Sequence, residues 1–283
     1  MKTLYVADLD GTLLRRDERI SGYTCGVINS LTERGLVFSY ATARSLATAG
    51  KVMEGLTAKI PLIIYNGAFI VDNATGDIIK ANYFDTDADM LLDSLFEAGV
   101  FPIVYSYIDG HEKFSFVPDL CTQGMKTFTE SRKGDRRVNI VNDPEELKLG
   151  DKFYITCIDE PEKLEPLYEE YKDKYHCVYQ VDIYTHDQWL EIMPKEASKA
   201  NAIRQLKEML GIGKVIAFGD GKNDIDMFGI ADEGYAVENA DDELKAIATG
   251  IIRSNDADGV AHWLEDNACM DKDITLPDSC QDK

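Results

Sequence analysis

Long apolar runs are missing from this chain of 283 residues, and none approaches the roughly 20 residues that a membrane-spanning helix needs. Near the start of the chain, Asp8 and Asp10 occupy a stretch that would have to be apolar in an export signal. The sequence therefore predicts a cytoplasmic protein with no membrane partner.

Paired cysteines and clustered histidines are also missing. The six cysteines are scattered and form no Cys-x-x-Cys pair, and the four histidines show no metal-ligand spacing. In a chain of this length without an export signal, such cysteines are expected to be reduced thiols. A zinc site of the usual kind is excluded by the same pattern.

Basic residues are scarce relative to acidic ones. Lys and Arg together number 30 against 51 Asp and Glu, which gives a formal net charge of −21. Phosphate backbones and anionic lipids are held by Lys and Arg, so the charge excludes nucleic acid and acidic membrane surfaces as partners. Hydrophobic residues make up 45% and aromatic residues 10%, which is enough apolar surface for a folded core.

Short apolar runs alternate with helical stretches at both ends of the chain. The expected strands cover residues 3–9, 36–41, 62–65, 214–218 and 234–237, and the expected helices residues 21–34, 45–55, 198–210, 223–230 and 241–248. This alternation predicts an α/β core, a Rossmann-like parallel sheet with helices on both faces.

The middle of the chain has a different pattern, with adjacent strands that favour hairpins. Turn-forming residues lie at 73–77 and at Asp109-Gly110, with apolar runs on either side. The expected strands here are 100–107, 113–117, 152–158, 177–184 and 189–192, with helices at 87–98 and 160–174. We therefore predict a core domain of residues 1–84 and 190–283, interrupted by an inserted α+β domain of residues 85–189.

Two acidic clusters follow two of the expected core strands. Asp8 and Asp10 come after the first strand, and Asp220 and Asp224 come after the strand at 214–218. Ligands of an open α/β sheet bind beyond the carboxyl ends of its strands, so both clusters belong to the edge where a site is expected. A single Asp-x-Asp-Gly is more often an ordinary turn, but two such clusters can meet if their strands are neighbours.

If the two acidic clusters lie side by side, a positive charge is needed to offset their repulsion. Two carboxylates about 4 Å apart repel each other by roughly 4 kcal/mol at an effective dielectric constant near 20. A divalent cation removes this repulsion, and an all-oxygen ligand set favours Mg²⁺ over zinc. Because Mg²⁺ usually takes one or two carboxylates together with a substrate phosphate, the acidic residues also predict a phosphorylated ligand.

Four motifs resemble those of the haloacid dehalogenase-like phosphohydrolases. In chain order they are Asp8-Leu9-Asp10-Gly11-Thr12, Thr42 after the apolar run 38–41, Lys199, and Gly219-Asp220-Gly221-Lys222-Asn223-Asp224. The insertion lies between the second and third motifs, as in the C2-capped (type IIB) branch. The segments 66–68 and 254–261 are similar to the Cof-type subgroup of that branch. Two positions depart from the pattern, because Ala43 and Ala200 stand where the family usually has glycine.

The resemblance implies a role for each motif. Asp8 would be the nucleophile and Asp10 the general acid and base, while Thr42 and Lys199 would hold the phosphoryl group. The implied Mg²⁺ ligands are Asp8, the main-chain carbonyl of Asp10, and Asp220, with Asp224 as a further ligand or a supporting residue.

Further residues are weaker candidates for contact with the substrate. Arg44 and Asn66 would approach it from the core, although Arg44 could equally be a cation at a helix start. Asn223 would support Lys199 or Asp220, or cap its helix. A basic cluster at Arg132, Lys133, Arg136 and Arg137 suits a phosphate clamp, but a solvated loop is the favoured interpretation.

The combined prediction is a Mg²⁺-dependent phosphatase that hydrolyses small phosphomonoesters, such as sugar phosphates or similar metabolites, through an aspartyl-phosphate. Two alternatives stay open: a hexose phosphomutase of the C2-capped branch, and a catalytically silent sensor of a phosphorylated ligand. The sequence identifies neither the substrate nor the oligomeric state.

Overall fold

A computed structural model describes residues 2–57, 61–182 and 185–268. The chain divides into two compact units. The first joins residues 1–81 to residues 198–283, and the second comprises residues 82–197.

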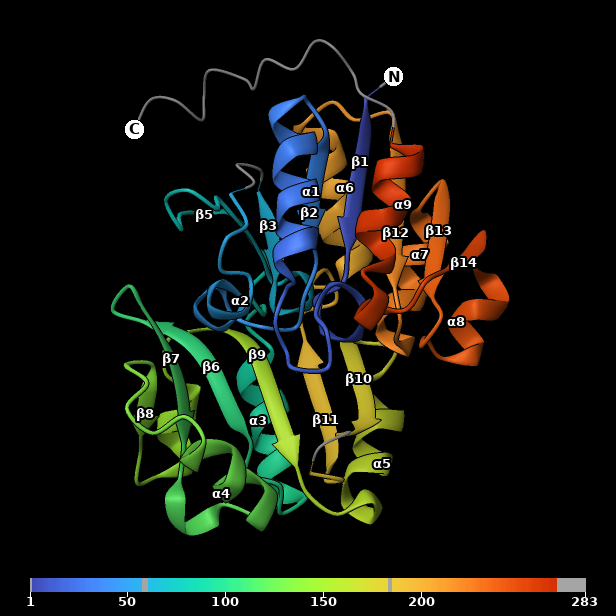
Figure 1. The fold of residues 1–283 in the computed structure, drawn as a ribbon. Helices are drawn as coiled ribbons and strands as arrows, with labels where there is room; N and C mark the ends of the chain where they lie inside the picture. Colours follow the sequence, from blue (N-terminus) through green and yellow to red (C-terminus); the bar gives the residue numbers. More distant parts are fainter. Residues whose placement is uncertain (1, 58–60, 183–184, 269–283) are drawn as a thin grey trace. The chain divides into compact units, whose positions relative to one another are not determined.

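The first unit is built on a five-stranded parallel sheet (Figure 1). Its strands lie in the order β14-β13-β12-β1-β2, so the first strand of the chain occupies an interior position. They are β1 (Thr3–Ala7), β2 (Val37–Tyr40), β12 (Lys214–Gly219), β13 (Glu233–Val237) and β14 (Gly250–Ile252). β1 and β2 consist almost entirely of buried residues, as expected where helices cover both faces of a sheet.

Helices cover both faces of this sheet. In Figure 1, α1 (Gly22–Glu33) and α9 (Gly259–Asn267) lie in front of it, and α6 (Lys199–Met209) and α7 (Ile225–Ile230) lie behind it. Two shorter helices, α2 (Leu46–Val52) and α8 (Asp242–Ile247), complete the unit. The predicted Rossmann-like α/β core is therefore confirmed. Helix α9 and strand β14 are additional elements that the sequence analysis did not include.

The expected strand at 62–65 does not pair along its length with the parallel sheet. Residues Leu62–Ile64 form β3, which belongs to a separate antiparallel sheet with β4 (Phe69–Val71) and β5 (Ile78–Ala81). A single parallel bridge between Ala41 and Ile63 connects the two sheets. The turn-forming residues 73–77 join β4 to β5, as the sequence predicted.

The second unit contains a six-stranded, mostly antiparallel sheet in the order β10-β11-β9-β6-β7-β8. Its strands are β6 (Ile103–Ile108), β7 (His111–Phe116), β8 (Val138–Ile140), β9 (Asp151–Ile158), β10 (His176–Val181) and β11 (Gln188–Met193). Only β7 and β8 pair in parallel within this sheet. The predicted strand at 177–184 extends over residues 183 and 184, which lie outside the described residues.

Helices α3 (Ala88–Glu97) and α5 (Pro161–Tyr171) pack on one face of this sheet, where Leu92 and Leu164 share a core with Ile155 and Leu190. A further helix, α4 (Gln123–Glu130), and strand β8 were not predicted. The α+β character of the inserted unit is confirmed. Because β11 pairs with both β9 and β10, the compact unit continues to Ala197, eight residues past the predicted boundary at 189.

The described cysteines are free thiols, and Cys25, Cys121 and Cys157 are buried. Cys269 and Cys280 lie outside the described residues. Among residues 2–57, 61–182 and 185–268, no helix has the length and apolarity needed to cross a membrane.

Candidate active site

Three neighbouring strands of the core sheet end at the same edge and carry the predicted site residues. Asp8 follows β1, Thr42 lies two residues after β2, and Asp220 follows β12. The ladder continues past β1, because the Asp8 N–H donates to the Phe218 carbonyl at 2.9 Å. The sheet order thus brings the two acidic clusters together, as the sequence required.

The chain makes a wide turn over residues Leu9–Leu13 directly after Asp8. Gly11 has φ of +80° there, a conformation that residues with a side chain rarely adopt. A Cβ at Gly11 would lie 2.1 Å from Oδ2 of Asp220, so glycine is also needed for the close approach. The next residue binds the same carboxylate, since Thr12 Oγ1 donates to Asp220 Oδ1 at 2.8 Å.

Lys199 enters the site from the first turn of α6. The Ser198 side chain caps this helix by accepting from the Asn201 N–H at 3.1 Å. The Lys199 Nζ then lies 2.5 Å from Asp8 Oδ1 and 2.8 Å from Asp224 Oδ1. Lys199 is only 2% exposed, Asp8 5% and Asp224 0%, so this is a buried network and not a surface ion pair.

Asp224 is engaged through both of its oxygens. While Oδ1 accepts from Lys199, Oδ2 accepts the main-chain N–H groups of Asp220 and Gly221 at 3.0 and 3.1 Å. Asp224 therefore holds the turn after β12 in place as well as the lysine. Its position in the short 3₁₀ turn Lys222–Asp224 allows its carboxylate to fold back onto that turn.

The pKa values of the buried acidic groups are raised, as expected for carboxylates that lie close together. Burial raises the pKa of Asp8 well above its usual value, although Lys199 opposes the shift. Burial, reinforced by the charge of Asp224, raises the pKa of Asp220 to about 7. For Lys199, burial disfavours the charged form, but Asp224 and Asp8 outweigh it and the pKa of Lys199 is raised.

The same carboxylates suit a divalent cation. One oxygen from each of Asp8, Asp220 and Asp224 lies within 4.8 Å of the others, close enough to share one ion. All the donors are oxygens, as Mg²⁺ prefers. A cation there would offset both the burial and the repulsion from Asp224 that raise the pKa of Asp220, so the residues present fit the predicted metal.

The carboxylate of Asp10 faces a different partner. Arg44 donates to it twice, from Nε to Oδ2 at 2.8 Å and from Nη2 to Oδ1 at 2.5 Å. Arg44 Nη2 also lies 3.1 Å from Glu18 Oε2. The side chain of Asp10 is thus paired with Arg44 and does not belong to the group of three carboxylates.

Thr42 and Asn66 are joined by backbone hydrogen bonds across the strand ends. The Asn66 N–H donates to the Thr42 carbonyl at 2.8 Å, and the Arg44 N–H donates to Thr42 Oγ1 at 3.1 Å. Asn66 is buried and has φ of +51°. Neither Ala43 nor Ala200 has positive φ, so alanine is tolerated where the resembling family usually has glycine.

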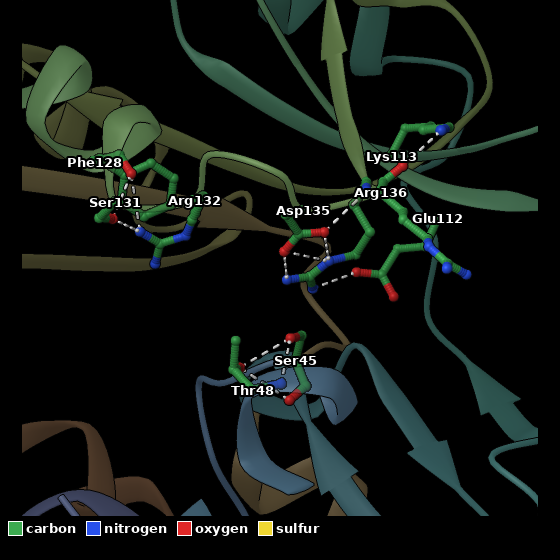
Figure 2. A network of polar contacts seen from close by, with 10 residues as sticks. Ser45, Thr48, Glu112, Lys113, Phe128, Ser131, Arg132, Asp135 and Arg136 are labelled. Carbon is green, nitrogen blue, oxygen red and sulfur yellow. Dashed lines mark hydrogen bonds and ion pairs between the residues drawn. The ribbon is translucent and has the colours of Figure 1, made fainter. Parts of the chain in front are cut away.

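The remaining predicted residues contribute less to this network. Asn223 is half-buried in the turn after β12, and no side-chain hydrogen bond to Lys199 or Asp220 is found within the described part of the chain. Two arginines of the basic cluster, Arg132 (labelled in Figure 2) and Arg137, make local contacts. Arg132 donates to the Phe128 carbonyl and to Ser131, while Arg137 pairs with Asp135 and Glu112.

Several supporting residues had no role assigned from the sequence, although Asp258 lies in the segment 254–261 that resembles the Cof-type subgroup. Asn239 follows β13 and donates from Nδ2 to the Gly11 carbonyl at 2.8 Å, and Glu18 is the second partner of Arg44. Asp258 accepts hydrogen bonds from Arg15, Ser21 and Thr24, which fixes the start of α1. The available signal was position in the sequence, because Asn239 lies two residues after a strand that ends at the same edge of the sheet as Asp8.

Comparison with known proteins agrees with this geometry. The sequence profile of haloacid dehalogenase-like hydrolases matches residues 5–264. The chain is 30% identical to a putative phosphatase of Buchnera aphidicola, an alignment that covers 94% of this chain and 96% of that protein. It is 26% identical to the 5-amino-6-(5-phospho-D-ribitylamino)uracil phosphatase YitU of Bacillus subtilis, with 93% and 96% covered.

The fold is shared with solved structures. A haloacid dehalogenase-like hydrolase structure from B. subtilis superposes with a TM-score of 0.75 at 24% identity, covering 94% of this chain and 99% of that one. The chain therefore belongs to the haloacid dehalogenase-like hydrolase family. Within it, the protein is a phosphatase of the C2-capped, Cof-type branch, as the motifs and the insertion predicted.

Proposed function

We propose that this phosphatase is Mg²⁺-dependent and hydrolyses small phosphomonoesters through an aspartyl-phosphate on Asp8. The observation that carries the proposal is the buried contact of Asp8 with Lys199, beside Asp220 and Asp224, which each place an oxygen within 4.8 Å of one of Asp8. A nucleophilic carboxylate, a fixed lysine and a divalent cation are the groups that phosphoryl transfer needs.

Asp8 would attack phosphorus in line, forming a bond from its carboxylate oxygen while the bond to the leaving oxygen breaks. Asp10 would give its proton to that leaving oxygen. In the second step a water would attack the phosphorus, Asp10 would take a proton from the water, and the Asp8 carboxylate would leave. Inorganic phosphate and the alcohol are then the products, and both aspartates return to their starting state.

Mg²⁺ bound by Asp8, Asp220 and the main-chain carbonyl of Asp10 would neutralise the negative charge of the phosphoryl group. Both oxygens of Asp224 are occupied, which favours a supporting role for Asp224 over direct coordination. Lys199 would keep Asp8 oriented and add positive charge close to the phosphoryl oxygens. Its burial supports this role, because charges act more strongly where water is excluded.

The other candidates would bind the substrate. Thr42 would donate a hydrogen bond from its hydroxyl group to a phosphoryl oxygen, since the hydroxyl oxygen already accepts a hydrogen bond from the Arg44 N–H. Arg44 and Asn66 would approach the substrate from the same strand ends, and Asn223 from the turn after β12. We further propose a sugar phosphate or a similar metabolite as substrate. The ribitylamino-uracil phosphate named for the relative YitU also belongs in the test panel.

Replacement of the nucleophile tests the proposal. Asp8→Asn is expected to reduce phosphate release from p-nitrophenyl phosphate and from sugar phosphates by at least about 10³-fold. Removal of Mg²⁺ with a chelator should stop turnover by the unchanged protein, and added Mg²⁺ should restore it. Asp266→Asn, at an exposed position of α9, is the matched control and should keep full activity.

Three outcomes would contradict the proposal. Near-normal turnover by Asp8→Asn would remove the mechanism. A requirement for a sugar bisphosphate activator, with no net phosphate release, would indicate the phosphomutase. Thermal stabilisation by phosphorylated ligands without any turnover by the unchanged protein would indicate the sensor.

A further inference from the structure

The loop after β13 contacts both acidic turns of the site. Its residues 238–241 follow Val237, the last residue of that strand. Asn239 Nδ2 donates to the Gly11 carbonyl at 2.8 Å, and the Asp241 N–H donates to the Asp220 carbonyl at 2.8 Å. One short loop thus connects to the turn after Asp8 and to the turn after β12.

The two turns that this loop connects are in close contact with each other. Gly11 approaches so closely that a Cβ there would lie 2.1 Å from Asp220 Oδ2. Thr12 donates to the other oxygen of the same carboxylate. The position of the Gly11 carbonyl therefore affects where the carboxylate of Asp220 lies relative to that of Asp8.

Asn239 is itself held at its other end. Its Oδ1 accepts the Asn255 N–H at 3.0 Å, and Asn255 Nδ2 donates to the Leu14 carbonyl at 2.8 Å. Asn255 is buried, so this second anchor is shielded from water. Both polar atoms of the Asn239 amide are consequently engaged, one with each of two loops, and the amide has little freedom to rotate.

We propose that Asn239 is a positioning residue that sets the spacing between the Asp8 and Asp220 carboxylates for Mg²⁺. The inference rests on the proposed function, since it concerns the cation that the phosphatase would use. Asn239 does not touch the three carboxylates. It acts through the main chain of Gly11, and its loss would let the turn after Asp8 relax away from Asp220.

The test measures cation binding in the absence of substrate. The full chain is stripped with a chelator, exchanged into buffer and titrated with Mg²⁺ by calorimetry. Asn239→Ala is expected to raise the Mg²⁺ dissociation constant about three- to tenfold, the range for loss of the one hydrogen bond, to the Gly11 carbonyl, that positions the turn after Asp8. At saturating Mg²⁺ its kcat should return close to that of the unchanged protein, a recovery that a general folding defect would not show.

Asn267→Ala provides a matched control. Asn267 is also exposed and also donates its amide to a main-chain carbonyl, that of Trp263 at 2.9 Å, but in α9. Its Mg²⁺ dissociation constant should equal that of the unchanged protein. If Asn239→Ala folds poorly in the chelator, as thermal unfolding would show, Asn239→Ser replaces it, because the shorter side chain cannot span both contacts.

Two results would overturn the inference, and they are distinguishable. An unchanged dissociation constant for a folded Asn239 variant, with Mg²⁺ still bound and used by the unchanged protein, refutes the role of Asn239 alone. Failure of the unchanged protein to bind Mg²⁺ refutes the proposed function together with this inference.

Discussion

Arg44 holds the carboxylate of Asp10 through two parallel hydrogen bonds, from Nε to Oδ2 and from Nη2 to Oδ1. Planar guanidinium and carboxylate groups match in this geometry, which fixes the direction of the carboxylate as well as its charge. The hydrogen bond to Asp10 and the neighbouring Glu18 raise the pKa of Arg44, so the arginine stays charged. Arg44 therefore orients the ionised form of Asp10, the form that would take a proton from water in the second proposed step, and at least one of the two hydrogen bonds must open when Asp10 carries a proton.

Substitution of Arg44 should affect poor leaving groups more than good ones. Without its partner Asp10 is less well placed to protonate an alkoxide, whereas p-nitrophenolate leaves with little help. For Arg44→Gln we expect kcat to fall about tenfold or more with an alkyl phosphate, a part of the gain that a general acid supplies, and much less with p-nitrophenyl phosphate. Arg34→Gln, at an exposed position, is the control. Equal losses for both substrates would instead assign Arg44 to phosphate binding.

Gly11→Ala should disrupt the site by two effects. The added Cβ would overlap the Asp220 carboxylate, and φ of +80° is strained for alanine. We expect a loss of stability of about 1–3 kcal/mol in denaturant titrations and a much weaker Mg²⁺ affinity. Gly26→Ala in α1, where a Cβ would meet no atom within 4 Å, should be neutral or slightly stabilising. Normal Mg²⁺ affinity of Gly11→Ala would argue against the close packing of the two turns.

The affinity for Mg²⁺ should fall as the pH is lowered through 7. Burial and Asp224 raise the pKa of Asp220 to about 7 in the cation-free protein, so protons and Mg²⁺ compete for this group. Without a cation, the pKa of Asp220 is higher in the folded protein than in the unfolded chain. Its contribution to the free energy of unfolding is therefore fully present below the unfolded pKa and is lost as the pH rises through about 7. Calorimetry at pH 6, 7 and 8 should show affinity improving with pH, by up to about tenfold per unit below the pKa. A constant affinity over this range would contradict the prediction.

Glu191 in the inserted unit offers a second pH test that is independent of the site. Burial raises the pKa of this carboxyl to about 7, partly offset by a hydrogen bond with Tyr154. Its raised folded-state pKa stabilises the protein at low pH, and this stability is lost as the pH rises through about 7. Glu191→Gln should therefore gain thermal stability relative to the unchanged protein between pH 5 and pH 8, by about 2 °C or more. The control is Glu162→Gln, at an exposed position in α5, which should show no such trend. An effect of Glu191→Gln on thermal stability that does not change with pH would contradict the raised pKa of Glu191.

Much of the core could be predicted because its pattern is local. The apolar run before Asp8 and the run at 214–218 each end in acids, and the carboxyl ends of parallel strands share one edge. These two features of the sequence predict that Asp8 and Asp220 lie side by side. Lys199 was harder, since only the order of the motifs distinguished it from a solvated helix-start lysine. The structure places it in the buried network with Asp8 and Asp224.

The contacts that the sequence did not predict depend on tertiary geometry. The bridging role of Asn239 follows from the positions of three loops, and nothing in its local sequence encodes that arrangement. Arg44 could have faced a substrate or solvent, and only the structure shows it on Asp10. Helix α4 escaped prediction because its few apolar residues, among them Met125 and Phe128, are separated by threonines and charges. Strand β11 could not be assigned to a unit before its partners β9 and β10 were known.

The interior position of β1 has a consequence for how the protein is made. β1 can pair with β2 soon after synthesis, but its other neighbour is β12, in which Lys214 aligns with Thr3 more than 200 residues later. The nascent chain thus exposes one edge of its first strand while the whole inserted unit, residues 82–197, leaves the ribosome. Such long-range pairing is slow, so the late arrival of β12 sets the earliest moment at which Asp8 can meet Asp220. A truncated nascent chain would carry Asp8 without the residues that surround it in the folded site.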